Sequence, residues 1–155
     1  MAASDPDTRE RSALPELPDP IDYEPHGEAR TERVLVIEDD QDIARFIEAN
    51  LHGGGFPDVS LAADGEEGLE RIEQEDFDLV LTGFMMPRVL GDEVVRRLRA
   101  SPRSRHLPVI VVTSTAATAY IRRAMLAGAD DYVIKPFDPE ELLARIRAVL
   151  RHRSS

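Results

Sequence analysis

The sequence predicts an α/β fold, a doubly wound five-stranded parallel sheet with helices on both faces. Two observations predict it. Five short apolar runs alternate along the chain with longer amphipathic segments. The runs are apolar throughout, as strands are when helices cover both faces of a parallel sheet. In folds of this kind the functional residues follow the carboxyl ends of the strands.

The amino-terminal half of the domain contains two strand–helix units. Residues 34–37, VLVI, form the first apolar run, and residues 42–51 follow as a helix. The apolar side chains that recur at helical spacing in this helix are Ile43, Phe46, Ile47 and Leu51. Glycines in HGGGF, residues 52–56, end the helix. The alternating segment 58–64 then predicts a strand, and the more polar segment 65–75 predicts a second helix.

The next two units follow the same pattern. Residues 78–82, DLVLT, form a continuous apolar strand, and residues 92–101 form the third helix. The run PVIVVTS, residues 108–114, is rich in β-branched residues and predicts the fourth strand. The fourth helix, residues 118–129, is expected to end at Gly128, because glycine readily adopts the left-handed conformation that terminates helices.

The last unit has the clearest helix start. Residues 131–135, DYVIK, form the fifth strand, and residues 138–153 form the last helix. Asp138 is the expected N-cap, Pro139 takes the first helical position, and Glu141 would close a capping box. The single apolar stripe of this helix consists of Leu142, Leu143, Ile146, Val149 and Leu150.

Composition limits the functions that the chain can have. With 155 residues it is long enough for one domain with its own core, and without cysteine it has no disulfides or thiolate metal sites. The net charge of −11 argues against a nucleic-acid-binding surface, because phosphate backbones require clustered cations. No segment has the ~20 apolar residues of a membrane span, and the amino terminus lacks a secretory signal. We therefore expect a cytoplasmic protein.

The amino-terminal segment 1–31 differs in composition from the domain expected at 32–153. It contains five of the eleven prolines, and residues 1–32 carry nine acidic but only three basic side chains. Such a segment buries too little apolar surface to offset its ordering entropy, so we expect a disordered tail. A partner-binding arm and a solvated leader are both compatible with this composition.

Polar side chains gather at the ends of the predicted strands. They are Glu38, Asp39 and Asp40 after the first strand, Thr113 and Ser114 after the fourth, and Lys135 with Pro136 after the fifth. Two carboxylates can hold a hard cation such as Mg²⁺, and a hydroxyl with an ammonium can hold an anionic group. Lys135 is also the only lysine among nineteen basic residues. Together these groups are typical of a phosphoryl-transfer site.

Each group also has a simpler explanation. The acidic triplet could begin a helix, with Asp40 as its cap. Thr113 could be an ordinary β-branched strand residue, and Lys135 could be a surface charge. The convergence of all these groups on one sheet edge favours the functional interpretation.

Four stretches carry a resemblance to a known family. VLVIEDD, DLVLTGFMMP, PVIVVTS and GADDYVIKPF resemble, in order and spacing, the receiver domains of bacterial two-component response regulators. The resemblance implies the flavodoxin-like (βα)5 fold with strand order 2-1-3-4-5. It also implies a signalling module, rather than an enzyme, that takes a phosphoryl group from a sensor kinase onto an aspartate.

The resemblance assigns roles to the residues at the strand ends. It implies that Glu38, Asp39 and the backbone carbonyl of Met85 bind Mg²⁺, and it implies no organic cofactor. The residues implied for the phosphoryl pocket and its aromatic switch are Thr113, Tyr132, Lys135 and Pro136. The peptide bond between the last two is expected to be cis, a state accessible mainly before proline.

The sequence departs from the family at Gly83, which occupies the position of the phosphoacceptor aspartate. Glycine has no side chain to attack phosphorus. Thr82 should point to the opposite face of the sheet. Asp78 lies at the start of the strand, about five residues of ~3.3 Å each away. The sequence therefore predicts that the acceptor is missing.

Three consequences are expected from the missing carboxylate. Mg²⁺ should bind only weakly, because one of its three carboxylate ligands is lost. Lys135 should turn toward Glu38 or Asp39. Gly83 should leave a small polar hollow that water can fill.

In receivers the fourth helix, fifth strand and fifth helix often form a dimer or output surface. The matching residues here are Ile121, Leu126, Asp131, Glu141, Arg145 and Arg147. The four charged residues resemble the dimer face of receivers joined to winged-helix DNA-binding domains, whereas Ile121 and Leu126 stand where charged partners are usual. Either these two side chains mark a different partner surface, or they extend the core stripe of their helix.

These inferences lead to one preferred hypothesis and two alternatives. We predict a degenerate receiver that signals through contact with a sensor kinase or a downstream effector, or as a homodimer, without being phosphorylated. In the first alternative, the chain is a phosphoacceptor receiver whose aspartate was replaced, naturally or by engineering. In the second, it is another flavodoxin-like module that binds a nucleotide or flavin, which the lack of a glycine-rich loop after the first strand disfavours.

Overall fold

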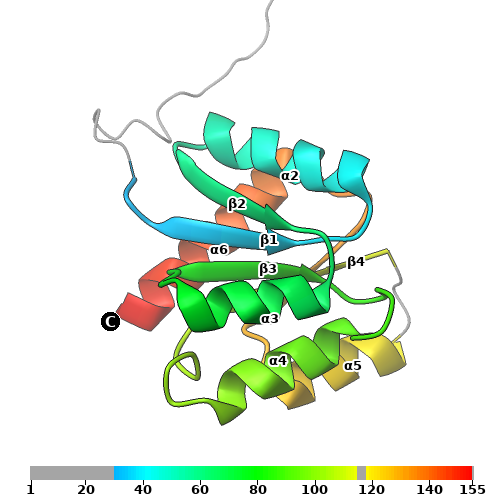
Figure 1. The fold of residues 1–155 in the computed structure, drawn as a ribbon. Coiled ribbons are helices and arrows are strands. Elements are labelled where there is room, and N and C mark those ends of the chain that lie inside the picture. The colour runs from blue at the N-terminus through cyan, green and yellow to red at the C-terminus, as the bar shows by residue number, and fades with distance from the viewer. Residues whose placement is uncertain (1–29, 115–117, 155) are drawn as a thin grey trace, which may run out of the picture. The chain divides into compact units, whose positions relative to one another are not determined.

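The computed structural model describes residues 30–114 and 118–154, so nearly all of the predicted tail at 1–31 lies outside the described residues. Within the described part, five strands alternate with five helices (Figure 1). The strands are β1 (Arg33–Ile37), β2 (Asp58–Ala62), β3 (Leu79–Gly83), β4 (Val109–Thr113) and β5 (Asp131–Ile134). The helices are α2 (Gln41–Gly53), α3 (Gly65–Gln74), α4 (Gly91–Ala100), α5 (Thr118–Ala127) and α6 (Pro139–Ser154).

The strands form one parallel sheet in the order β2-β1-β3-β4-β5, which confirms the predicted fold class. In the register, Ile37 of β1 lies opposite Ala62 of β2 and Thr82 of β3. Gly83, the last residue of β3, lies opposite Val112 of β4. Because the strands are parallel and end at similar heights, the residues that follow them meet at one edge of the sheet.

Two apolar clusters separate the sheet from its helices. Helices α2 and α6 cover one face, and α3, α4 and α5 cover the other (Figure 1). Val34 and Val36 of β1 belong to the first cluster, while Leu35 and Ile37 belong to the second. Each strand therefore has to be apolar on both faces, which explains the uninterrupted apolar runs in the sequence.

Several helices begin or end at the residues that the sequence predicts. The Asp40 carboxylate accepts hydrogen bonds from the backbone N–H groups of Asp42 and Ile43, at 3.0 and 3.2 Å, and so caps α2. Gly128 follows the last residue of α5 with a φ of +116°, a conformation that side chains disfavour. No helix within residues 30–114 and 118–154 is long and apolar enough to cross a membrane.

Two predictions about the helices are wrong. Asp138 caps α6 as predicted, since its carboxylate accepts from the N–H of Glu140 at 3.0 Å, but Glu141 does not close a capping box. The carboxylate of Glu141 instead accepts from Nε of Arg145 at 3.3 Å. Phe46 does not lie on the buried stripe of α2 and is 50% exposed. The buried residues of that helix are Ala44, Ile47 and Leu51, and Phe46 lies beside this stripe, on the side of the strand ends.

Candidate functional site

A cavity of about 620 Å³ lies at the carboxyl ends of the strands. Its lining residues come from the ends of β1, β4 and β5, from the loop after β3, and from α2. They are Glu38, Asp39, Asp40, Ile43, Phe46, Met85, Ser114, Lys135, Pro136 and Phe137. The structure therefore brings the predicted acidic residues and the single lysine into one cavity.

Glu38 is the most buried charged residue of this cavity, at 5% exposure. One carboxylate oxygen accepts from the Asp40 N–H at 3.1 Å, and the other lies 3.5 Å from Nζ of Lys135. Burial raises the pKa of Glu38 above its ordinary value, while the Asp40 N–H and the Lys135 ammonium offset part of that rise. The ion pair agrees with the expectation that Lys135 turns to Glu38 or Asp39.

The space beside Gly83 is partly filled by Glu38. A Cβ atom at position 83 would lie 3.0 Å from Oε1 of Glu38 and 3.7 Å from Cγ of Met86. A side chain at this position would therefore point at the Glu38 carboxylate. The hollow predicted at Gly83 is smaller than expected, because that carboxylate oxygen lies against it.

The backbone that follows β3 is tightly packed. The hydroxyl of the buried Thr82 donates to the carbonyl of Gly83 at 3.0 Å, and the N–H of Gly91 donates to the carbonyl of Phe84 at 2.7 Å. A Cβ atom at Gly91 would overlap the Gly83 carbonyl oxygen and the Phe84 Cα. Glycine at position 91 is thus required by the close approach of the two backbone segments, and it holds position 83 in place.

The residues expected to form the switch lie on β4 and β5. Thr113 is 3% exposed, and its backbone carbonyl accepts from the Lys135 N–H at 2.7 Å. Tyr132 is half-buried against the cluster on the α3, α4 and α5 side. The Arg145 guanidinium carbon lies 6.0 Å from the centre of the Tyr132 ring. The Lys135–Pro136 peptide bond is cis, as expected.

The donor groups do not fit a fully coordinated metal ion. Within residues 30–114 and 118–154, no group of three or more His, Cys, Asp or Glu side chains is arranged to hold one. Glu38 and Asp39 both line the cavity, but Glu38 is paired with Lys135. Weak Mg²⁺ binding by these two residues and the Met85 carbonyl stays a prediction.

The expected interaction face contains paired charges and exposed apolar side chains. Arg145 contacts both carboxylate oxygens of Asp131 at 3.0 Å, so these two charges of the face are paired within the chain. Arg147 is half-buried on α6. On α5, Leu126 is 78% exposed and Ile121 partly exposed, whereas Ala124 is the buried residue. The alternative that Leu126 extends the core stripe is therefore wrong.

Sequence reasoning missed the apolar wall of the cavity. The sequence pattern places Ile43 and Phe46 only on the apolar spacing of α2, and it assigns no role to Phe137. The Phe46 and Phe137 rings pack against each other with centroids 5.8 Å apart. The available signal was that Phe46 lies one residue away from the i, i+4 spacing of Ile43, Ile47 and Leu51.

The match to a known family decides what kind of protein this is. Residues 34–147 match the response regulator receiver domain. This chain belongs to that family. It is 41% identical over 121 residues to the response regulator ArlR of Staphylococcus saprophyticus, and the match covers 78% of this chain and 53% of ArlR. The chain spans about half the length of the ArlR proteins that it matches.

Solved receiver structures agree with the fold. A CheY-like receiver domain protein from Methanospirillum hungatei is 30% identical, with a TM-score of 0.74 over 81% of this chain and 98% of that one. The receiver domain of the sensor histidine kinase PA1611 from Pseudomonas aeruginosa is also 30% identical, with a TM-score of 0.71 over 81% of this chain and all of the other. That structure contains a magnesium ion in its active-site cleft.

Proposed function

We propose that this chain is a receiver module of a two-component system that acts through protein–protein contact without accepting a phosphoryl group. Family membership supports the signalling role. The observation that supports the rest is Gly83, which ends β3 beside the Glu38 carboxylate and offers no nucleophilic atom. Any switch between Thr113 and Tyr132 then needs an effector other than phosphate, since a ligand shifts a population only by preferring one state.

The Glu38–Lys135 pair supports this proposal. In receivers that accept phosphate, the matching lysine contacts the phosphoryl group. Here the ammonium lies 3.5 Å from Oε1 of Glu38, the same oxygen that faces the missing side chain at position 83. Glu38 thereby offers Lys135 a negatively charged partner in the absence of an acceptor carboxylate.

The proposed partners are a sensor kinase, a downstream effector or a second copy of the chain, in the cytoplasm. Two large exposed apolar side chains, Met125 and Leu126, are neighbours on α5 and favour a contact there, because contiguous exposed apolar surface is typical of protein-binding faces. Leu126→Lys should reduce partner recovery in a pull-down, or dimer formation in analytical ultracentrifugation, at least tenfold. The matched control is Glu73→Lys on α3, which also changes an exposed helical position and should have no effect.

Phosphorylation is tested directly by incubation with acetyl phosphate and Mg²⁺. The unmodified chain should gain no mass of about 80 Da, the mass of a phosphoryl group, because position 83 cannot form an acyl phosphate. Intact mass spectrometry measures the gain. A labelled unmodified chain would contradict the proposal.

A second candidate is a phosphoacceptor receiver whose aspartate has been replaced at position 83. The retention of Glu38, Asp39, Thr113 and Lys135 around the same strand ends favours it. Under this candidate Gly83→Asp should become labelled, since only the flexible end of Glu38 has to move to admit the new side chain. Gly83→Asn has nearly the same shape without the nucleophile and should stay unlabelled. An unlabelled aspartate variant would argue that the remaining site is no longer competent.

A further inference from the structure

We propose that the cavity at the strand ends binds a small organic cation with an apolar body, such as an aromatic quaternary ammonium compound. This inference goes beyond the proposed function and does not depend on it, because binding requires no phosphoryl chemistry. The cavity volume of about 620 Å³ lies within the range of about 300–1,000 Å³ that small-molecule sites occupy.

One wall of the cavity is apolar and aromatic. Phe46 from α2 and Phe137 from the loop after β5 pack with their ring planes at 44° to each other. Phe46 is 50% exposed and Met85, from the loop after β3, is 55% exposed. These are two of the four large apolar side chains that are exposed in the described part of the chain, and both line this one cavity. Their exposure is explained if an apolar group covers them.

The lining of the cavity carries an excess of negative charge. Three carboxyl groups, those of Glu38, Asp39 and Asp40, line the cavity together with a single ammonium, that of Lys135. Glu38 already lies within ion-pair distance of that ammonium at 3.5 Å. Asp39 and Asp40 are both exposed, and Asp40 uses one carboxylate oxygen to cap α2.

This combination of groups selects a cation over an anion. A carboxylate ligand would enter among three carboxyl groups, and the one ammonium beside them already lies within ion-pair distance of Glu38. A cation is attracted by Asp39 and Asp40, and it also gains from the negative faces of aromatic rings such as Phe46. An apolar body attached to the cation can then cover Phe46, Phe137 and Met85.

The test is a titration of the full ¹⁵N-labelled chain with benzyltrimethylammonium, followed by NMR in buffer without divalent cations. Saturable shifts are expected at the backbone amides of Ile43, Phe46 and Ser114. Phe46→Ala should weaken binding about tenfold and Asp39→Asn about threefold, in line with the loss of one ring face or one nearby charge. Leu126→Ala removes a more exposed apolar side chain outside the cavity and should leave the affinity unchanged.

Several outcomes would overturn the proposal. One is the absence of saturable shifts at millimolar benzyltrimethylammonium, and another is equal binding of 3-phenylpropanoate, which carries a similar ring and the opposite charge. Shifts of the Ile43 and Phe46 amides with protein concentration alone would identify a second copy as the occupant. Shifts caused by a basic amphipathic peptide but not by the small cation would identify a protein segment instead.

Discussion

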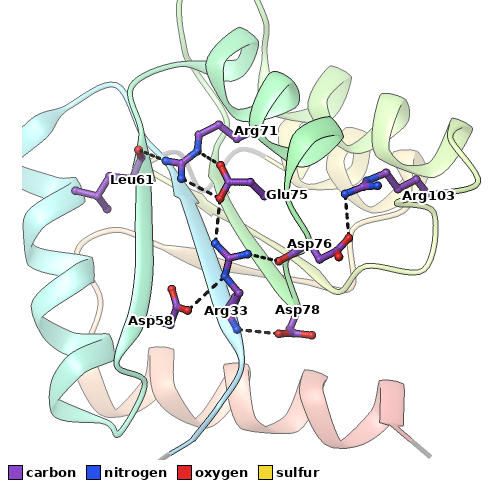
Figure 2. Close-up of polar contacts among 8 residues, drawn as sticks. All are labelled: Arg33, Asp58, Leu61, Arg71, Glu75, Asp76, Asp78 and Arg103. Carbon is purple, nitrogen blue, oxygen red and sulfur yellow. Dashed lines mark hydrogen bonds and ion pairs between the residues drawn. The ribbon is translucent and has the colours of Figure 1, made fainter.

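The edge of the sheet where the strands begin (the amino edge) and the edge where they end (the carboxyl edge) differ in how their charged side chains are paired. At the amino edge, charged side chains have fixed partners (Figure 2). The Arg33 guanidinium donates to the Glu75 carboxylate at 3.0 Å and to the Asp76 carbonyl at 2.9 Å, and it lies 3.3 Å from Asp58. Arg71 donates to the same Glu75 carboxylate through Nε at 3.0 Å. Each cation of this cluster thus has a carboxylate partner.

At the carboxyl edge, carboxylates outnumber cations around an open cavity. Within the described part of the chain, the only ion pair among its lining residues is the 3.5 Å contact between Glu38 and Lys135. This difference separates charged side chains that stabilise the fold from those that line the cavity. Compensated charges at the amino edge connect β1 to the end of α3, whereas at the carboxyl edge three carboxylates line the cavity with one ammonium.

The largest loss of stability is expected from a substitution at Gly91, where two backbone segments near the carboxyl edge pack closely. Gly91→Ala should lower the free energy of unfolding by about 3 kcal/mol, because its Cβ would overlap the Gly83 carbonyl and Phe84. Urea denaturation measures the change. Gly53→Ala, where a Cβ meets nothing within 4 Å, is the control and should stay within ~0.5 kcal/mol. Equal effects of both variants would refute the close packing at position 91.

A smaller loss of stability is expected when the charge cluster around Arg33 at the amino edge is disrupted. Arg33→Ala removes charge-assisted hydrogen bonds and the contact of the guanidinium with the Phe77 ring, 4.9 Å from its centre. The free energy of unfolding should fall by about 1–2 kcal/mol. Arg97→Ala removes an exposed i, i+4 pair with Glu93 and should cost no more than ~0.5 kcal/mol. If the two variants are equally stable in urea, the amino-edge cluster has no special structural role.

The smallest expected effect is a difference between Glu38 and Glu75 in how they make the free energy of unfolding depend on pH. Because burial raises the pKa of Glu38, its contribution to stability is present below the ordinary value of 4.5 and is lost as pH rises through the raised pKa. Glu38→Gln should therefore gain stability relative to the unmodified chain as pH rises above about 4.5. Urea denaturation from pH 5 to 8 measures this slope.

Glu75 should show the opposite behaviour. Hydrogen bonds from Arg71 and Arg33 lower the pKa of Glu75, so its contribution is present above 4.5 and is lost as pH falls through the lowered pKa. Glu75→Gln should thus be less stable than the unmodified chain at neutral pH, and the gap should close below about pH 4.5. Slopes of the same sign for Glu38→Gln and Glu75→Gln would contradict the contrast between the edges.

The fold could be predicted because its main determinants are local in sequence. Continuous apolar runs specify strands buried on both faces, and residues such as Asp40 and Gly128 mark helix ends through their own backbone preferences. The site could be predicted in outline for a topological reason, since residues that follow parallel strands must meet at one edge. For this reason the sequence predicts that Glu38 and Lys135 lie close together.

Long-range side-chain directions could not be predicted in the same way. Glu75 and Asp76 lie more than forty residues from Arg33 in sequence and Asp58 lies twenty-five away, and none of these partners is marked by a motif. The buried Asp92 of α4 pairs with Arg123 of α5 at 2.8 Å. From the sequence alone, an acidic residue in the first turn of a helix is sufficiently explained by the helix dipole. The exposure of Phe46 depends on where the strand ends lie relative to α2, which helical periodicity alone does not specify.

Lys135 gives the cavity a unique chemical handle. Since it is the only lysine in the chain, an amine-reactive crosslinker or fluorophore has one side-chain target, and that target lies at the strand ends. A crosslink formed through a side-chain amine would therefore report which molecule stands over the cavity, without any engineered attachment point. Protection of Lys135 from such a reagent would likewise measure occupancy of the cavity in the unaltered protein.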